Sequence, residues 1–301
     1  MQVRPIFIRV DTQVYPYFTI SVPTPFSVNI SSSSACGILT FYCLLMHNKT
    51  MEPICNQISE CKCCGSSAHL YGVVDFNKHC SHNLMAPVGI PVYYYRCVTC
   101  DFIFTNAFDE FSKNDFNKYI YNSDYILVDS EFKEERPKRN AKSISELLSA
   151  NKNIHILDYG GGQGGFAEIL KESGFTNVDT YDPFYGSDSV KPEKRYDCIT
   201  CLEVAEHSIE PRETFKDIFS LLKDDGIVML ATLIQPETIN EIGVNWWYIA
   251  PRNGHVSIYS MKSLQSLIEP YHFSVNSFYS GFHVLFRLVP EFARHFFRSS
   301  P

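Results

Sequence analysis

The sequence predicts an α/β protein in which a parallel sheet carries helices on both faces and a small β module precedes it. Three observations support this prediction. A short apolar run ends in the glycine-rich turn Gly160–Gly165, and a stretch with helical spacing follows it. Two further apolar runs, Asn177–Tyr181 and Tyr196–Leu202, have the length of buried parallel strands. Two C-x-x-C pairs lie ahead of all of these segments.

The length and the net charge of the chain limit the classes of protein to which it can belong. The 301 residues allow about two domains, and 45% hydrophobic residues are enough for a sizeable core. A net charge of -7 with a pI near 5.8 disfavours a general nucleic-acid binder, although a local basic patch is compatible with it. We expect a cytoplasmic protein with a small-molecule partner, without nucleic-acid or membrane partners, and of undetermined oligomeric state.

Residues 1–50 differ in composition from the rest of the chain. They are rich in Ser, Thr, Pro and aromatic residues, and the apolar run Ala35–Met46 has 12 residues, too few to span a bilayer. The run has no basic flank and starts too late for a signal peptide. The segment is either a poorly ordered tail or loosely docked arm, or it precedes a biological start at Met46 or Met51. We favour the second interpretation.

The cysteines cluster between Cys61 and Cys100, which favours metal binding over a disulfide framework in a chain of this size. Four thiolates in two C-x-x-C pairs are the set that closes a tetrahedral structural zinc site. Expected strands at Pro91–Arg96 and Asp101–Thr105 flank the second pair, so residues 51–130 are predicted to form a zinc-ribbon-like β module. The predicted zinc ligands are Cys61, Cys64, Cys97 and Cys100.

The same block leaves alternatives open. Cys63 lies between the two members of the first pair and is predicted not to be a ligand. The long spacer carries His79, Cys80 and His82 as substitute ligands. A set of reduced, buried cysteines without metal is the other interpretation.

Residues 109–150 are expected to connect the two parts. Asp109–Asp129 is rich in aromatic and Asn residues, typical of either a cleft lining or a packing seam between domains. Glu131–Lys142 reads as a solvated charge run, and a lead-in helix is predicted to begin at Ser143. Residues 131–150 are therefore predicted as linker and lead-in helix, and residues 151–301 as the nucleotide-binding domain.

The residues around the glycine turn indicate the ligand. A dinucleotide fingerprint fits Gly160, Gly162 and Gly165, but Asp158 at the end of the first strand would repel a pyrophosphate. A carboxylate there suits the ammonium group of S-adenosylmethionine. Asp182 ends the second strand, where an acidic side chain can accept hydrogen bonds from ribose hydroxyls.

Later segments supply candidates for the acceptor end of the site. Glu203, Glu206 and His207 follow the strand Tyr196–Leu202, and ligands of such sheets bind at the carboxyl ends of strands. A helix at Pro211–Leu222 and a strand at Gly226–Leu233 are expected next. An antiparallel pair is expected to complete the sheet, formed by Phe273–Phe278 and Phe282–Leu288.

The stretch Asn245–Ser260 contains both tryptophans and has no clean period. A loop with two Trp predicts a lid or a substrate wall. His255 in this stretch is the candidate general base, since imidazole titrates near neutral pH. Tyr259 is the further residue predicted to meet the acceptor.

From Cys61 onward the chain resembles class I methyltransferases with an N-terminal zinc-binding domain, among them nucleotide-sugar C-methyltransferases. Asp158, Gly160, Gly162 and Gly164 match their motif I, and H-V-S-I-Y-S from His255 resembles their E-H-x-x-Y-F-S segment, with Gly254 in place of the Glu. The resemblance implies a Rossmann-like sheet, S-adenosyl-L-methionine as methyl donor, and structural Zn²⁺. Implied site residues are His255 as base, with Asp158, Gly160, Gly162, Gly164, Asp182 and Glu203 at the cofactor.

Three functions remain open from the sequence. The first is a methyltransferase acting on a small, sugar-like or other acceptor. The second is an RNA methyltransferase of the ribosomal-RNA type that binds RNA through the zinc module. The acidic pI disfavours this function. The third is an oxidoreductase or a non-enzymatic nucleotide binder.

Overall fold

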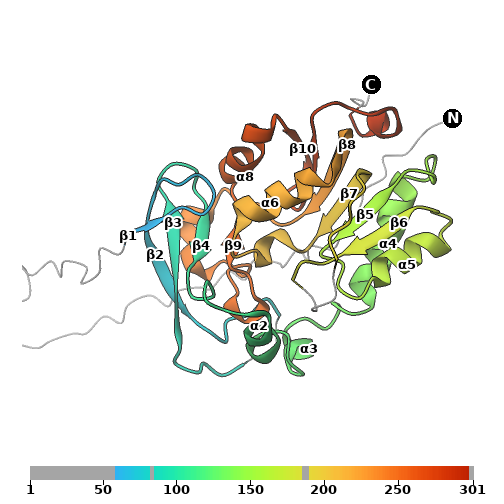
Figure 1. Ribbon diagram of the computed structural model, residues 1–301. Helices are drawn as coiled ribbons and strands as arrows, with labels where there is room; N and C mark the ends of the chain where they lie inside the picture. Colours follow the sequence, from blue (N-terminus) through green and yellow to red (C-terminus); the bar gives the residue numbers. More distant parts are fainter. Residues whose placement is uncertain (1–57, 82–84, 185–189, 298–301) are drawn as a thin grey trace, which may run out of the picture. The chain divides into compact units, whose positions relative to one another are not determined.

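The computed structural model describes residues 58–81, 85–184 and 190–297, and these residues form two β-sheets (Figure 1). The predictions for residues 1–50, for a start at Met46 or Met51, and for His82 lie outside the described residues. Within them, no helix is both long and apolar enough to cross a membrane.

The larger sheet has six strands in the order β10-β11-β8-β7-β5-β6. The four strands β8, β7, β5 and β6 are parallel, and β11 and β10 extend the sheet in antiparallel pairing. The predicted α/β fold with a Rossmann-like sheet is therefore confirmed. The strands are β5 (Ile156–Tyr159), β6 (Val178–Tyr181), β7 (Tyr196–Leu202), β8 (Leu222–Ala231), β10 (Ser274–Tyr279) and β11 (Phe282–Phe286).

Helices cover both faces of this sheet (Figure 1). Successive residues of a strand point to opposite faces, so neighbouring residues pack against different helices. Ile156 packs with α4 (Glu135–Leu147) and α5 (Gly165–Glu172) in one apolar cluster. Its neighbour Leu157 packs in another cluster with α6 (Pro211–Ser220) and α8 (Met261–Ile268). β5 is thus buried on both sides, which explains its largely apolar sequence.

The smaller sheet is antiparallel and has the order β1-β2-β3-β4-β9. Its last strand comes from the tryptophan stretch, so a segment of the second half of the chain completes the sheet of the cysteine module. Ile103 pairs with Ile258, and Phe104 pairs with Ser257. The strands are β1 (Ile58–Glu60), β2 (Ser67–Asp75), β3 (Pro91–Cys97), β4 (Ile103–Thr105) and β9 (Ser257–Ile258).

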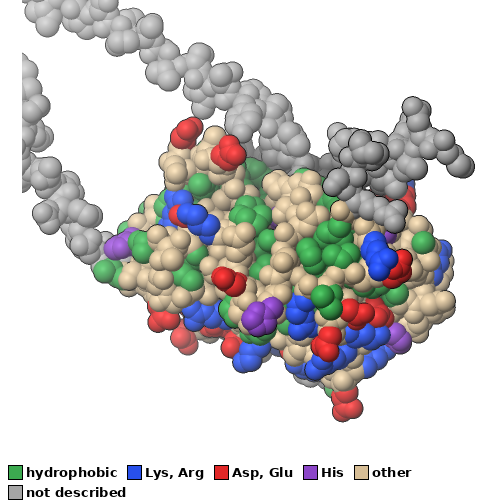
Figure 2. All heavy atoms as spheres, turned by 90° about the horizontal axis from the view of Figure 1, so that it is seen from above, with side chains coloured by type: hydrophobic (Ala, Val, Ile, Leu, Met, Phe, Trp, Pro, Cys, Tyr) green, Lys and Arg blue, Asp and Glu red, His purple; other side chains and the backbone are tan. Residues whose placement is uncertain are grey.

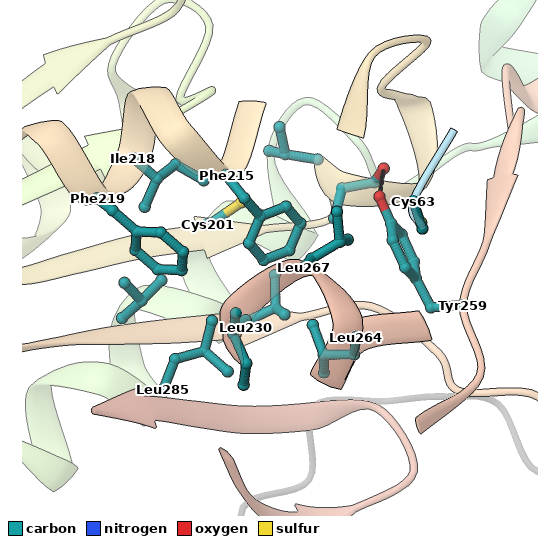
Figure 3. Packing of buried hydrophobic residues seen from close by; sticks show 14 of the residues in the cluster. Cys63, Cys201, Phe215, Ile218, Phe219, Leu230, Tyr259, Leu264, Leu267 and Leu285 are labelled. Atoms are coloured by element: carbon teal, nitrogen blue, oxygen red, sulfur yellow. Dashed lines mark hydrogen bonds between the residues drawn. The ribbon is translucent and has the colours of Figure 1, made fainter. Parts of the chain in front are cut away.

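One apolar cluster joins the two sheets. Cys61, Cys97 and Phe102 of the cysteine module belong to the same buried cluster as Phe215 of α6 and Leu230 of β8. Figure 3 shows Cys63 and Tyr259 at one end of this cluster, with residues of α6, α8 and the sheet packed beside them. The cysteine module and the larger sheet therefore share a core.

The charge run predicted as a solvated linker is mostly helix. α4 begins at Glu135, not at Ser143, and buries Asn140, Ala141 and Ile144. Pro137 is compatible with this helix because it lies in the first turn, where a missing N–H breaks no helical hydrogen bond. The buried residues share one face of the helix, so the segment packs as an amphipathic helix.

The aromatic run Asp109–Asp129 is a packing seam. Phe111, Phe116 and Tyr125 pack with residues of the small sheet and of the tryptophan stretch. The capping box of Ser112 and Asp115 starts a helix in this run. The remaining elements are α2 (Lys113–Tyr119), α3 (Tyr125–Val128), α7 (Ile239–Ile242) and the short 3₁₀ turns at Ala205–His207, Gly243–Asn245, Pro251–Asn253, Glu269–Tyr271 and Glu291–Phe296.

Candidate functional site

The glycine turn lies where the larger sheet reverses its strand order, between β6 and β7 on either side of β5. Ligands of such sheets bind at the carboxyl ends of the strands next to this point. Gly160 has a φ of +77°, and a Cβ there would lie 2.5 Å from Cγ2 of Val204. At Gly161 a Cβ would lie 1.9 Å from Oδ2 of Asp158. The turn therefore packs directly against the residues after β7 and against the acidic end of β5.

Asp158 is the buried carboxylate of this turn. Oδ1 accepts a hydrogen bond from Oγ1 of Thr200 at 3.4 Å, whereas Oδ2 has no hydrogen-bond partner among the described residues. Burial, and to a lesser degree the charge of Asp182, raises the pKa of Asp158 to about 7. A buried carboxylate oxygen without a donor costs free energy, and the ammonium group of a ligand would satisfy it.

Asp182 follows β6 and faces the same turn. Its Oδ2 accepts a hydrogen bond from the backbone N of Gly162 at 2.8 Å, and its Oδ1 accepts one from N of Phe184 at 2.8 Å. These bonds hold the carboxylate in place, and a carboxylate oxygen has lone pairs for further donors. The structure thus brings Asp158, Asp182 and the glycines together at one edge of the sheet.

Glu203 directly follows β7 in a left-handed conformation with a φ of +57°. For a residue with a side chain this conformation is strained and is typical of functional sites. Burial and the nearby charge of Glu206 raise the pKa of Glu203 to about 7, and the guanidinium of Arg136 opposes this rise. Arg136 itself forms two 2.8 Å hydrogen bonds with the carboxylate of Asp129.

A second polar cluster follows Glu203 along the chain. Single ligand atoms of Glu206, His207 and His255 all lie within 4.8 Å of one another. Glu206 is fully buried, and its Oε1 accepts a 2.7 Å hydrogen bond from the hydroxyl of Tyr248. The His207 and His255 rings meet edge to face with centroids 5.0 Å apart. Three of the four residues predicted at the acceptor end are therefore neighbours.

Both imidazoles of this cluster are held neutral. Burial lowers the pKa of His207, and burial together with the neighbouring His207 lowers the pKa of His255 well below its ordinary value. A neutral imidazole has one lone-pair nitrogen, which can accept a proton or bind a metal.

Tyr259 is not part of this cluster. Its ring is fully buried between Phe102 and Phe215, and its hydroxyl donates a 2.9 Å hydrogen bond to the carbonyl of Ala205 (Figure 3). Its place in the apolar cluster indicates a packing role.

The tryptophan stretch is an interior segment, and the lid prediction is wrong. Trp246 is 7% exposed, and the residues from Tyr248 to Tyr259 are buried. Lys78 donates hydrogen bonds to the carbonyls of Trp246 and Ile249 and so ties the segment to the small sheet. The stretch is a buried segment that carries His255.

Four residues that the sequence did not single out contact the site. Tyr248 binds Glu206, Arg136 pairs with Asp129 beside Glu203, and Thr200 binds Asp158. The hydroxyl of Tyr121 is near the position that a Cβ on Gly254 would take, at 3.5 Å. Two of them had a signal in the sequence. Thr200 lies opposite Asp158 on the predicted neighbouring strand. Tyr121 lies in the aromatic run that is typical of a cleft lining or a packing seam, and its ring centroid is 6.2 Å from that of His207.

The four cysteines of the two C-x-x-C pairs converge in the small sheet. Sγ of Cys61 lies 3.5 Å from Sγ of Cys100, and Sγ of Cys64 lies 3.4 Å from Sγ of Cys97. Tetrahedral zinc with bonds of about 2.3 Å places its sulfur ligands roughly 3.8 Å apart, so the four thiols fit the ion. Cys63 and Cys80 lie outside this group.

Backbone N–H groups point at these sulfurs, as expected for thiolate ligands. N of Cys63 is 3.4 Å from Sγ of Cys61, and the N atoms of Thr99 and Cys100 are each 3.4 Å from Sγ of Cys97. Four sulfur ligands complete a zinc shell, so a bound ion would stabilise the module and leave no position for a substrate.

Comparison with known proteins agrees with this fold. Residues 132–277 match the family model described as a methyltransferase domain. The match includes the glycine turn, Asp158, Asp182 and the cluster of Glu206, His207 and His255. The match covers slightly less than half of the chain, and the sheet order is compatible with such a domain.

Solved structures resemble the chain at low identity. The 1,6-didemethyltoxoflavin-N1-methyltransferase of Burkholderia thailandensis is 14% identical, with a TM-score of 0.43 over 79% of this chain and 99% of that one. The magnesium protoporphyrin IX methyltransferase of Synechocystis PCC 6803 is 16% identical, with a TM-score of 0.37 over 57% and 94%. At these values the likeness says nothing about the substrate of this chain. No curated protein sequence matches it.

Proposed function

We propose that the chain is an S-adenosylmethionine-dependent methyltransferase that acts on a small-molecule acceptor. The observation that carries this proposal is Oδ2 of Asp158, a buried carboxylate oxygen without a hydrogen-bond donor beside the glycine turn. The donor molecule has an ammonium group that would neutralise this carboxylate. A diphosphate would be repelled by it.

The residues of the turn fit the donor molecule. Asp158 would bind its ammonium group, and Asp182 would accept hydrogen bonds from its ribose hydroxyls. Gly160, Gly162 and Gly164 would allow the backbone to approach it closely. The bound molecule supplies a methyl group activated by its own sulfonium, so the protein's task is to position the acceptor and remove its proton where needed.

The acceptor end would be formed by Glu206, His207 and His255. The close packing of Val204 on Gly160 places the start of this segment against the glycine turn. Neutral imidazoles and a carboxylate can hold a hydroxyl and take up its proton. We propose that Glu203 lies between the residues that bind the methyl donor and those that bind the methyl acceptor.

A small acceptor is favoured over RNA by charge. The chain carries a net charge of -7, and Figure 2 shows Lys and Arg side chains interspersed with Asp and Glu on the face in view. RNA binding depends on neutralising phosphates with clustered basic residues. We infer that the zinc cluster has a structural role, because its core is continuous with that of the larger sheet.

Calorimetric titration of the purified chain tests the proposed function. S-adenosylmethionine and S-adenosylhomocysteine are both expected to bind at one site per chain, because both carry the ammonium and ribose groups that the site would recognise. NAD is expected not to bind, because of its diphosphate. Binding of NAD without binding of the sulfonium compound would overturn the proposal and favour an oxidoreductase.

The affinity for S-adenosylmethionine is expected to rise with pH up to neutrality. Without ligand the pKa of Asp158 is about 7, so at lower pH its carboxyl must lose a proton before it can pair with the ammonium group. Bound ammonium lowers this pKa, so binding releases a proton, and the affinity drops up to about tenfold per pH unit below 7. Calorimetry between about pH 5.5 and pH 7 measures this slope. A constant affinity over that range would contradict the assignment of Asp158.

A further inference from the structure

The cluster of Glu206, His207 and His255 has a donor set that suits a metal ion. It offers two imidazoles and one carboxylate, with single ligand atoms of each within 4.8 Å of the others. Imidazole and carboxylate ligands bind divalent transition-metal ions, whereas the four thiolates of the small sheet suit zinc. The two groups of residues share no member, so they would be two separate sites.

Each imidazole has a backbone carbonyl beside its Nδ1. Nδ1 of His207 lies 3.1 Å from the carbonyl oxygen of Gly254, and Nδ1 of His255 lies 2.9 Å from the carbonyl oxygen of Tyr248. A carbonyl can only accept, so Nδ1 carries the proton in both rings and Nε2 has the lone pair. Metal-binding histidines nearly always donate their other N–H in this way.

One oxygen of the Glu206 carboxylate has no hydrogen-bond donor among the described residues. Glu206 is 0% exposed, and its Oε2 has no hydrogen-bond partner among the described residues, while Oε1 accepts from Tyr248. Arg136 is the nearby guanidinium, and both of its terminal nitrogens bind Asp129. A buried carboxylate oxygen in this position is explained by a cation between it and the two imidazoles.

We propose that Glu206, His207 and His255 bind a divalent transition-metal ion and that the methyl acceptor is a hydroxyl compound that binds to this ion. Three protein ligands leave open positions on the ion, and a hydroxyl oxygen can take one of them. The ion site follows from the geometry alone. Its link to the acceptor rests on the proposed function.

The methyl transfer that would follow conserves atoms and charge. With the lone pairs of both imidazoles on the ion, the ion would activate the acceptor in their place: it would lower the pKa of the bound hydroxyl, whose proton would pass to solvent. An oxygen lone pair forms the new O–CH₃ bond. The electron pair of the broken S–CH₃ bond stays on sulfur, which changes from a sulfonium to a neutral thioether.

Mn²⁺ titration of the full chain with its thiolate site filled by zinc tests the ion site. Mn²⁺ prefers oxygen and imidazole ligands, so the loss of the free Mn²⁺ signal in electron paramagnetic resonance reports this site and not the thiolates. We expect one Mn²⁺ per chain, and a loss of affinity of at least about 100-fold in Glu206→Gln and in His255→Ala. His295→Gln is the matched control and is expected to bind Mn²⁺ normally, because His295 contacts the carbonyl of Leu147 and the ring of Phe296, in another part of the fold.

A second measurement uses the wild-type chain, because buried substitutions can unfold a protein. Bound Mn²⁺ is expected to broaden the imidazole NMR signals of His207 and His255 and to leave those of His69 and His295 sharp. Equal broadening of all four, no bound Mn²⁺, or equal binding by all variants would overturn the metal site. S-adenosylmethionine binding is measured on the same samples, so a chain that binds the donor but no Mn²⁺ loses only this inference.

Discussion

Replacing Cys97 with Ser is expected to destabilise the whole described chain, not only the cysteine module. The substitution removes one of four converging thiols, and structural zinc supplies about 10–16 kcal/mol of apparent binding free energy in small modules. Cys61, Cys97 and Phe102 share one buried cluster with α6, α8 and the larger sheet. We therefore expect a loss of at least about 5 kcal/mol in the free energy of unfolding, or about 10–20 °C in melting temperature.

The matched control for this prediction is Cys63→Ala. Cys63 is 3% exposed and belongs to the same apolar cluster, but it lies outside the four-cysteine group. The control is expected to retain one zinc per chain and to lose only about 1 kcal/mol, as for a small truncation in a core. The melting temperature and the zinc content of both variants test this prediction. A Cys97→Ser protein with full zinc content and an unchanged melting temperature would exclude this site.

The local patterns of the sequence were sufficient to predict that Asp158, Asp182 and the glycine turn lie together and that the four cysteines converge. Asp158 and Asp182 each end a strand, and the parallel register of β5 and β6 brings their carboxyl ends to one edge. The two C-x-x-C pairs lie on turns next to strands that pair with each other, so their convergence also follows from local structure. Such features depend on short stretches of chain and on rules that hold for all parallel sheets.

Long-range pairing could not be predicted. β9 joins the sheet of the cysteine module although more than a hundred residues separate it from β4, and nothing in Ser257–Ile258 specifies that partner. For this reason the tryptophan stretch reads as a lid or a substrate wall in the sequence and is a buried segment in the structure. Arg136 was missed for a different reason: its segment reads as a solvated charge run, but it forms the first turn of α4, from which Arg136 pairs with Asp129.

Replacing Asp158 with Asn is expected to abolish binding of S-adenosylmethionine without destabilising the protein. Asn keeps the size of the side chain and its contact with Thr200 but removes the charge that would pair with the ammonium group. Breaking a buried ion pair on one side costs about 3–5 kcal/mol, which corresponds to a loss of affinity of about 100-fold or more. Because burial already disfavours the charged form of Asp158, the melting temperature of the unliganded protein is expected to stay the same or to rise.

Two comparisons isolate the ammonium contact. Asp179→Asn changes another carboxylate on the neighbouring strand, one that pairs with Lys194 and Tyr196, and it is expected to leave the affinity unchanged. Adenosine lacks the ammonium group, so Asp158→Asn should not affect its binding, whereas Asp182→Asn should weaken it through the ribose. Calorimetry with both ligands on the three variants separates these effects. If Asp158→Asn bound adenosine and S-adenosylmethionine each as tightly as the wild type, the carboxylate at the end of β5 would have no role in holding the donor.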